Sequence, residues 1–283
     1  MTTTPSFLVE PMRHTPLAMT TTADGASALI APDGTSFPVV RGVPMFLASD
    51  AESLEFETMY QNLSEPWKYS GRAAEMLRHE FVVALAREVA EKPDWVLDLG
   101  CSVGQLSAQL GQHFPRIASL DVSATAVLKA KTTCEASSKA EFAFVVASAT
   151  ALPFATESFS LVVASDGLFG WELSETAQQQ VLSEITRVLK PGGRAIFTDY
   201  LGHKKFPFLL KLIDSSPLQR ERTEYLHDRL WYQMESWFHL AQDNALVKAI
   251  LRNRSLALGL RGIARLFGAR ASKHIGIVAR KRG

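Results

Sequence analysis

The sequence has few cysteines, no long hydrophobic run and no excess of charge of either sign. Its 283 residues contain only Cys101 and Cys134, which excludes a disulfide scaffold and a four-cysteine zinc site. Two free thiols suit a reducing compartment, so we expect a cytoplasmic protein. The chain has 30 lysines and arginines and 29 aspartates and glutamates, a net charge of +1. The overall charge therefore does not indicate binding to nucleic acid or to a membrane.

Segments that would carry the chain to or through a membrane are also lacking in the sequence. No apolar stretch approaches the roughly 18 residues that a spanning helix needs. The first residues show no basic region followed by an apolar one, so we expect no signal peptide. Hydrophobic residues make up 47% of the chain, which is enough for a sizeable core. The sequence thus predicts a globular protein of one large domain or two unequal ones.

Four zones follow one another along the chain. Residues 1–50 are rich in threonine, proline, alanine and glycine, and they predict a small β-rich or irregular segment. Residues 51–92 predict a lid segment that covers the site, together with a lead-in helix. Residues 93–200 alternate short apolar strands with helices, which is the pattern of a mainly parallel sheet. Residues 201–283 predict a mostly helical insertion and a last strand of the same domain.

The residues that carry chemistry follow the first apolar strand of the third zone. The stretch from Val96 to Leu106 predicts a strand, a tight turn at Gly100 and a helix, whose first turn offers unpaired N–H groups. Asp98 ends this strand and Asp121 ends the next one. An open α/β sheet binds ligands at the carboxyl ends of its strands. We therefore expect the two carboxylates to converge on a nucleotide-type ligand, with Asp121 at its ribose hydroxyls.

Two alternatives compete with this interpretation. A dinucleotide-binding turn requires glycine at its first, third and sixth positions, which here are Gly100, Ser102 and Gln105. Only one of the three matches, because the second glycine of this turn is Gly104. The other alternative is a strand–turn–helix unit that binds nothing, and the two carboxylates at strand ends argue against it.

Several blocks, in order, resemble class I S-adenosylmethionine-dependent methyltransferases of the type 11 and NodS-like groups. Residues 98–104 resemble their first motif, and residues 117–123 resemble their second strand with its ribose-binding acid. Residues 148–154 resemble the block at the adenine, and residues 185–198 a helix–turn–strand block. The resemblance implies a Rossmann-like α/β sheet with helices on both faces, a small N-terminal cap and a helical insertion before the last strand.

The same resemblance implies that S-adenosylmethionine is the cofactor and that residues 93–200 bind it. It assigns ten residues to cofactor binding: Asp98, Gly100, Cys101, Gly104, Gln105, Asp121, Val122, Ser148, Ala149 and Thr150. Three serines depart from the family's pattern. Ser102 replaces a glycine, which is tolerable if its φ is negative. Ser148 replaces an aspartate at the adenine amino group and would accept that hydrogen bond more weakly. Ser160 replaces an aspartate where we expect no effect on the cofactor.

The segment before the core is similar to part of the NodS-like group. It contains Glu65-Pro66-Trp67-Lys68-Tyr69, with Glu75 and Arg78 further on. The resemblance implies that Trp67 and Tyr69 cover the cofactor and that Arg78 pairs with its carboxylate. The alternative is that the aromatic rings pack the helix onto the sheet and that Arg78 is solvated.

The first zone resembles the end of a small zinc ribbon over residues 35–47. A ribbon needs cysteine or histidine ligands in closely spaced pairs. No cysteine precedes residue 101, so such a ribbon is degenerate, and we expect no metal. The alternative is a loop that closes over the active site.

Methyl transfer needs in-line placement of the acceptor, and a hydroxyl acceptor also profits from a general base. Polar side chains follow the fourth and fifth predicted strands, and the catalytic candidates among them are His203, Asp166 and Tyr200, with Asp199 beside them. A histidine side chain is the commonest general base in proteins, which favours His203. The alternative is that a histidine in such a loop is simply solvated. Four aromatic residues are candidates for an apolar acceptor pocket or for core: Trp171, Trp231, Tyr232 and Trp237.

The charge is distributed unevenly along the chain. From Leu240 onward there are ten bases and one acid, a net charge of +9, with leucines, an isoleucine and a phenylalanine between the bases. Such a basic amphipathic segment suits anionic lipid or an anionic acceptor. The alternative is a solvated helix face. The net charge of +1 is therefore the sum of +9 in this segment and −8 in residues 1–239.

We expect a methyltransferase that acts on an oxygen or nitrogen of a small-molecule acceptor, a lipid or natural product included. An rRNA or tRNA methyltransferase is the first alternative, motivated by the two terminal segments. The Asn/Asp-Pro-Pro-Tyr motif of a base pocket is lacking, so we expect no nucleic-acid partner. A cofactor-binding protein without catalysis is the second alternative. The sequence does not indicate an oligomeric state.

Overall fold

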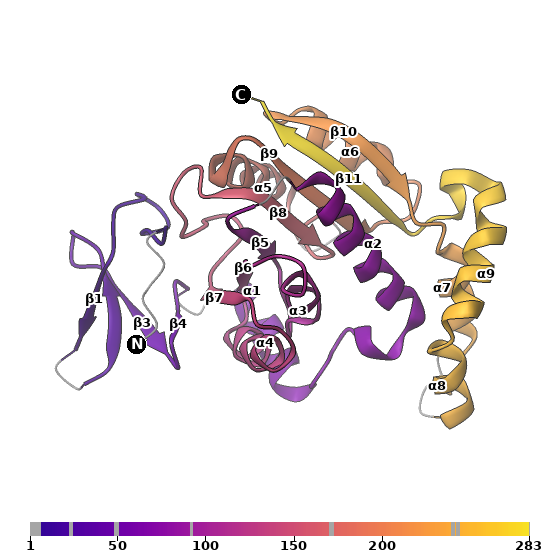
Figure 1. Ribbon diagram of the computed structural model, residues 1–283, viewed down its shortest axis with the longest axis horizontal. Helices are drawn as coiled ribbons and strands as arrows, with labels where there is room; N and C mark the ends of the chain where they lie inside the picture. The colour runs from indigo at the N-terminus through magenta and orange to yellow at the C-terminus, as the bar shows by residue number, and fades with distance from the viewer. Residues whose placement is uncertain are drawn as a thin grey trace.

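A seven-stranded sheet lies at the centre of the protein (Figure 1). The computed structural model describes residues 7–22, 25–47, 51–90, 93–169, 173–238, 241 and 244–282. The strand order is β10-β11-β9-β8-β5-β6-β7, and β5 to β9 are parallel while β11 runs antiparallel between β9 and β10. The strands are β5 (Val96–Leu99), β6 (Arg116–Asp121), β7 (Glu141–Val146), β8 (Phe159–Ser165), β9 (Leu189–Tyr200), β10 (Leu218–Tyr225) and β11 (His274–Lys281). The predicted Rossmann-like sheet is confirmed.

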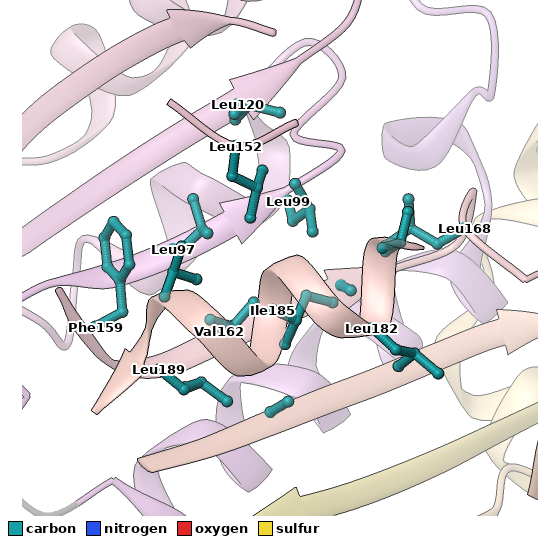
Figure 2. Packing of buried hydrophobic residues seen from close by; sticks show 14 of the residues in the cluster. Leu97, Leu99, Leu120, Leu152, Phe159, Val162, Leu168, Leu182, Ile185 and Leu189 are labelled. Carbon is teal, nitrogen blue, oxygen red and sulfur yellow. The ribbon is translucent and has the colours of Figure 1, made fainter. Parts of the chain in front are cut away.

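Helices cover both faces of this sheet because successive residues of each buried strand point to opposite sides. On one face lie α2 (Ala73–Val89), α3 (Gln105–Leu110) and α4 (Ala124–Ser137), and on the other α5 (Glu175–Val188) and α6 (Phe206–Asp214). Val96 packs with Leu85 under α2. Its neighbour Leu97 packs with Ile185 and Leu182 of α5, as Figure 2 shows. Burying each such side chain stabilises the fold by about 1.5–3 kcal/mol.

Local signals in the sequence mark the helix boundaries. Ser123 caps α4, since its side chain accepts a hydrogen bond from the N–H of Ala126. α5 ends at Val188, directly before the Lys190-Pro191-Gly192-Gly193 turn, in which Gly192 has a φ of +74°. The helix predicted from apolar residues four apart is α2, which buries Leu77 and Leu85. These predictions depend on neighbouring residues only, and they are confirmed.

The N-terminal zone is β-rich, as predicted, and docks at the far edge of the main sheet. Its four antiparallel strands are β1 (Ala18–Thr21), β2 (Ser27–Ile30), β3 (Ser36–Val40) and β4 (Val43–Pro44). The N–H of Phe46 donates to the carbonyl oxygen of Val146 in β7 at 2.8 Å. Leu29 and Phe46 join the main core, so the zone is part of one hydrophobic body.

The C-terminal zone contains a strand that the sequence did not indicate. β10 pairs with β11 at the sheet edge, and half of its side chains are exposed, three of them charged. Charged side chains protect an edge strand from further pairing, and they also hide it from hydrophobic periodicity. The predicted helices follow β10 as α7 (Arg229–Trp237), α8 (Ala245–Leu251), α9 (Arg254–Ala264) and the 3₁₀ turn η3 (Arg265–Ala271). Among the described helices, none is long and apolar enough to cross a bilayer.

Candidate functional site

A cavity of about 470 Å³ lies at the carboxyl ends of the parallel strands. Small-molecule sites have volumes of about 300–1,000 Å³, so the cavity is large enough for a cofactor-sized ligand. Six of the ten residues predicted to bind the cofactor line it: Gly100, Asp121, Val122, Ser148, Ala149 and Thr150. Of the predicted catalytic residues, Asp166 and Tyr200 line it, and His203 does not.

Asp121 is held rigidly at the end of β6. One carboxylate oxygen accepts the N–H of Ser102 at 2.8 Å, and the other accepts the N–H of Ser123 at 3.0 Å. Burial raises the pKa of Asp121, although these backbone N–H groups oppose the shift. The two N–H donors orient the carboxylate beside Val122, where both residues face the cavity.

The turn after β5 contains two glycines with different roles. Gly100 has a φ of +82°, and no atom lies within 4 Å of the place where a Cβ would stand. A side chain there would project into open space beside the cavity. Gly104 has a φ of +89°, and a Cβ there would lie 2.8 Å from the Cα of Ala130. Gly104 therefore permits the close packing of α3 on α4 and does not line the cavity.

Ser102 corrects one prediction. Its φ is +50°, in the left-handed region, whereas the sequence interpretation required a negative value. A non-glycine residue in that region costs on the order of 1–2 kcal/mol. Hydrogen bonds hold it there, since the hydroxyl of Tyr60 donates to Ser102 Oγ at 2.7 Å and the Ser102 N–H donates to Asp121. The position normally taken by glycine is thus filled by a serine that links two walls of the cavity.

Three other predicted cofactor residues lie behind the turn, outside the lining of the large cavity. Asp98 is buried, and its carboxylate accepts a hydrogen bond from Ser107 Oγ at 2.5 Å. Burial raises the pKa of Asp98 to about 7, although the bond from Ser107 opposes this shift. Cys101 is buried in the core around α4, and Gln105 Nε2 donates to Glu65 Oε1 at 3.0 Å. These three side chains support the turn from the side of α3.

The lead-in zone forms one wall of the cavity. It contains α1 (Ala51–Asn62) and a short 3₁₀ turn, η1 (Tyr69–Gly71). Trp67 and Tyr69 both line the cavity, as the lid interpretation predicts, and Trp67 Nε1 donates to Tyr60 Oη at 3.0 Å. Glu57 of α1 accepts the Ser123 hydroxyl at 2.7 Å at the start of α4. The wall is therefore fastened directly to the elements that hold Asp121.

In residues 148–154, the block that resembles an adenine-binding segment, Ser148 forms hydrogen bonds with Thr150. Its hydroxyl lies 2.7 Å from that of Thr150 and also accepts the Thr150 N–H at 3.2 Å. This small turn presents Ser148, Ala149 and Thr150 to the cavity without a charged group. The loop after β7 thus supplies backbone and hydroxyl partners only.

A buried charged network occupies the opposite end of the cavity. Arg78 is 1% exposed, so the interpretation of Arg78 as a solvated residue is wrong. Its Nε lies 3.0 Å from Glu75 Oε2 and 3.2 Å from Asp166 Oδ2, and a second nitrogen contacts Ser165 Oγ. Burial alone would raise the pKa of Asp166, but Arg78 and His274 lower it below its usual value. Asp166 is therefore ionised at neutral pH.

His274 is the main residue that sequence reasoning missed. Its Nε2 lies 3.1 Å from Asp166 Oδ2, and its Nδ1 lies 2.5 Å from Asp228 Oδ2. Burial disfavours the imidazolium, yet Asp166 and Asp228 together raise the pKa of His274 to about 10. At neutral pH both ring nitrogens then donate to carboxylates. His274 is a fixed cation at the cavity wall and has no lone pair with which to accept a proton.

Asp199 is a carboxyl group that faces the cavity and has a pKa near neutrality. It lies at the end of β9, lines the cavity, and accepts the Phe169 N–H at 2.9 Å. Burial raises the pKa of Asp199 to about 7, and the nearby charge of Asp166 adds to the shift. A carboxyl group with such a pKa exchanges a proton readily at physiological pH.

The aromatic candidates separate into different roles. Tyr232 lines the cavity, and its hydroxyl donates to Glu75 Oε1 at 2.5 Å. Trp231 packs in the core between α2 and the C-terminal helices, and Trp237 is 75% exposed. Trp171 lies outside the described residues. Tyr232 is thus the one of the three described aromatic candidates that reaches the site.

Glu75, Asp166 and His274 place one potential ligand atom each within 4.8 Å of the others. Cations already balance these acids, because Arg78 contacts both carboxylates and His274 carries a proton. A metal ion would have to displace that proton and face the guanidinium. The group is therefore better described as an ion-pair network.

Among the described N-terminal residues, no such ligand group occurs and none lines the cavity, so neither the zinc-ribbon nor the closing-loop interpretation finds support.

Comparison with known sequences identifies relatives of the core. Residues 96–193 match the family described as "Methyltransferase domain". The demethylmenaquinone methyltransferase of Beutenbergia cavernae is 31% identical over 149 residues, which is 48% of this chain and 57% of that protein. The one from Clavibacter sepedonicus is 30% identical over 179 residues, which is 56% of this chain and 69% of that protein. The chain thus spans less than two thirds of the first of these relatives.

The fold also resembles solved structures. The N-methyltransferase NodS from Bradyrhizobium japonicum, in complex with S-adenosyl-L-homocysteine, aligns with a TM-score of 0.57 at 15% identity. The alignment covers 83% of this chain and 100% of that one. At this level of identity the likeness concerns the fold, and it includes the parallel strands whose ends form the cavity.

Proposed function

Because the chain belongs to the class I S-adenosylmethionine-dependent methyltransferase family, we propose that it methylates an oxygen or nitrogen of a small molecule held beside the cofactor. The observation that carries the proposal is one continuous cavity. It joins Asp121 and Ser148, at the ends of β6 and β7, to Asp166 and Asp199, at the ends of β8 and β9. Both reactants can then be held in line, which alone supplies a large part of the acceleration.

The residues of the first half fit the cofactor. Asp121 carries a buried charge at the end of β6, where ribose hydroxyls can donate to it. Gly100 leaves open space where a side chain would stand, so a ligand can approach the backbone of the turn. Ser148 and Thr150 offer hydroxyl groups to the adenine. When bound, the cofactor supplies an electrophilic methyl group on a sulfonium.

The second half suits a neutral acceptor with an apolar body and one hydroxyl or amine. Tyr69, Tyr200 and Tyr232 line it with rings. Asp166 Oδ1 is buried, and no other described residue donates a hydrogen bond to it. An acceptor hydroxyl or amine can supply that missing donor. This pairing would orient the acceptor before reaction.

Asp199 is the general base in this proposal. Asp199 would take the proton of the acceptor's hydroxyl or amine, while the acceptor's oxygen or nitrogen would receive the methyl group and the carbon–sulfur bond of the sulfonium would break to leave a neutral thioether. The pKa of Asp199 near 7 matches this role at physiological pH. His274 and Arg78 are positioning residues, because they hold Asp166 ionised and keep its carboxylate in place.

Calorimetric titration with S-adenosylmethionine tests the cofactor half. We expect the Asp121→Asn variant to bind roughly 10- to 100-fold more weakly, since a charged hydrogen bond contributes about 1.5–3 kcal/mol. The control is Asp94→Asn, whose carboxylate is exposed and paired with Arg116. Equal affinity of both variants for the cofactor, or no binding by the unmodified protein, would overturn this assignment.

Transfer of a radiolabelled methyl group into a cell extract, followed by identification of the product, tests the acceptor half. We expect label in a small molecule. Label confined to RNA would contradict the small-molecule proposal. Cofactor binding without transfer to any extract or acceptor panel would favour a non-catalytic protein instead.

A further inference from the structure

The C-terminal helices expose an apolar surface. α9 packs on α7 and α2 and buries Ala257 and Ala264, which are seven residues apart on one helix face. Four large apolar residues lie elsewhere on α9 and η3, with exposed fractions of 36%, 53%, 83% and 63%: Leu256, Ile263, Leu266 and Phe267. We name these four the apolar ridge. Figure 1 shows α8 and α9 along the outer edge of the molecule, at the end opposite β1 and β3.

The spacing of the ridge follows the helix. Leu256 and Ile263 are seven residues apart, and Leu266 follows three residues later, so these three side chains share one face of the helix. Helical faces of this kind are normally buried against the rest of a protein. Here the fully buried positions of α9 are the small alanines, Leu260 packs at the side against the same cluster, and the ridge side chains are exposed. Large exposed apolar groups that lie together indicate an interaction surface.

Basic residues are frequent on the same elements as the ridge. Five of them are exposed on α8, α9, η3 and the turn between the two α-helices: Lys248, Arg252, Arg254, Arg265 and Arg270. From residue 244 to the C-terminus the sequence contains no aspartate or glutamate. Arg254 pairs with Glu80 of α2, so part of this charge also fastens the helix to the body. The surface combines apolar side chains and positive charge without local compensation by acids of its own segment.

We propose that the apolar ridge, together with the exposed bases of the same helical segment, docks this protein on an anionic lipid bilayer. The ridge would enter the boundary between headgroups and acyl chains, and the bases would lie at the lipid phosphates. Basic amphipathic helices bind membranes in this way, through buried apolar area together with attraction to anionic lipid. The inference is independent of the proposed methyl transfer, because it requires neither cofactor nor acceptor.

Charge and hydrophobicity together favour this occupant over two others. RNA would use the bases but would leave the ridge in water, because phosphates offer nothing to leucine and phenylalanine. A second copy of the chain, docked face to face, would bring two positive surfaces together at a cost in repulsion. An anionic bilayer offers acyl chains to the apolar ridge and phosphate groups to the bases.

The docking surface lies close to the cavity. α9 packs on α7, and Tyr232 of α7 lines the cavity. Trp231, the preceding residue, packs with Leu251 and Ala257 at the base of α8 and α9. Docking would therefore bring the α7 side of the cavity near the lipid.

Co-sedimentation with vesicles tests the proposal on the full chain. We expect binding to vesicles containing roughly one third phosphatidylglycerol, and much weaker binding to phosphatidylcholine alone. The Leu266→Ser, Phe267→Ser double variant should bind at least about tenfold more weakly, because two large apolar side chains no longer enter the bilayer. Arg265→Gln and Arg270→Gln should each weaken binding roughly fivefold, and only at low salt.

Matched controls lie on other parts of the surface. Leu63→Ser replaces a leucine that is 52% exposed, and Lys139→Gln replaces an exposed base. Neither should change vesicle binding, and circular dichroism should show that all variants are folded. Absence of binding to anionic vesicles would overturn the proposal. So would binding to an oligoribonucleotide that the ridge variant retains, or a dimer in sedimentation velocity that the ridge variant abolishes.

Discussion

The two halves of the cavity are built in different ways. In the cofactor half, Asp121 and Ser148 bond to residues two positions further on, within turns that directly follow β6 and β7. In the acceptor half, His274 bonds to Asp228 and Asp166 across 46 and 108 residues. The first half holds these two side chains largely through backbone N–H donors, and the second depends on ionisable side chains that only the completed sheet brings together.

The difference affects electrostatics as well. The cofactor half holds the Asp121 carboxylate with neutral backbone N–H donors from Ser102 and Ser123, so its geometry does not depend on a second charged group. The acceptor half contains buried acids whose charge depends on Arg78 and His274. Removing one member of such a network leaves the others unpaired in a medium that solvates them poorly. The acceptor half should thus be the more sensitive of the two to substitution and to pH.

The largest expected effect concerns Asp199. The Asp199→Asn variant should lower kcat by roughly 10²- to 10⁴-fold, since a positioned general base contributes about that much. A base must be deprotonated to act, so kcat of the unmodified enzyme should rise with pH through about 7, and the rise should vanish in the variant. Steady-state kinetics across pH would measure both.

The control for Asp199 is Asp214→Asn, an exposed acid paired with Arg220. It should leave kcat and its pH profile unchanged. An Asp199→Asn enzyme that keeps the rise near pH 7 would show that another group accepts the proton.

The next effect concerns stability. Arg78→Gln should lower the free energy of unfolding by about 3–5 kcal/mol, because it leaves Glu75 and Asp166 buried without their cation. Arg254→Gln breaks the exposed pair with Glu80 and should cost less than about 1 kcal/mol. Urea denaturation of both variants gives the comparison. Similar losses of unfolding free energy in the two variants would mean that breaking the buried network costs no more than breaking an exposed ion pair.

A third effect is the pH dependence of stability that His274 gives to the acceptor half of the cavity. Partners in the folded state raise the pKa of His274 from 6.5 to about 10, so its contribution to stability is complete below pH 6.5. It should be lost progressively as pH rises toward 10, at up to about 1 kcal/mol per pH unit. Unfolding free energies measured across this range should fall less steeply in His274→Gln. His113→Gln, at an exposed histidine, should keep the full slope.

The smallest effect belongs to the cofactor half. Ser148→Asp introduces the charged acceptor that the family usually has at this position, and it should tighten cofactor binding by a few-fold, up to about tenfold. Ser160→Asp, the other serine in an aspartate position, should leave the affinity unchanged because Ser160 is not among the cavity residues. Calorimetric titration compares the two. Weaker binding by Ser148→Asp would show that its bond to Thr150 matters more than charge.

Prediction from sequence succeeded where a local pattern determines the result. Turn glycines, the serine cap of α4 and apolar periodicity all act between neighbours, and the core strands and α2 follow from them. The six predicted cofactor residues that line the cavity came from the family resemblance. Prediction from sequence failed for β10, because an edge strand with charged side chains carries no apolar pattern. His203 was named as a candidate and His274 was not, because closeness to a strand end along the chain was the available signal.

The sequence by itself indicated a mainly parallel sheet and the uneven charge of the C-terminal segment, and its ordered motif blocks resembled a family that uses S-adenosylmethionine. The strands, helices and turns were readable because local patterns encode them. Tertiary structure alone decided the acceptor site. The antiparallel register of β11 sets His274 opposite Tyr200, and the packing of α2 brings Glu75 and Arg78 to Asp166. Such pairings depend on loop closure over long stretches of chain, which no local pattern records.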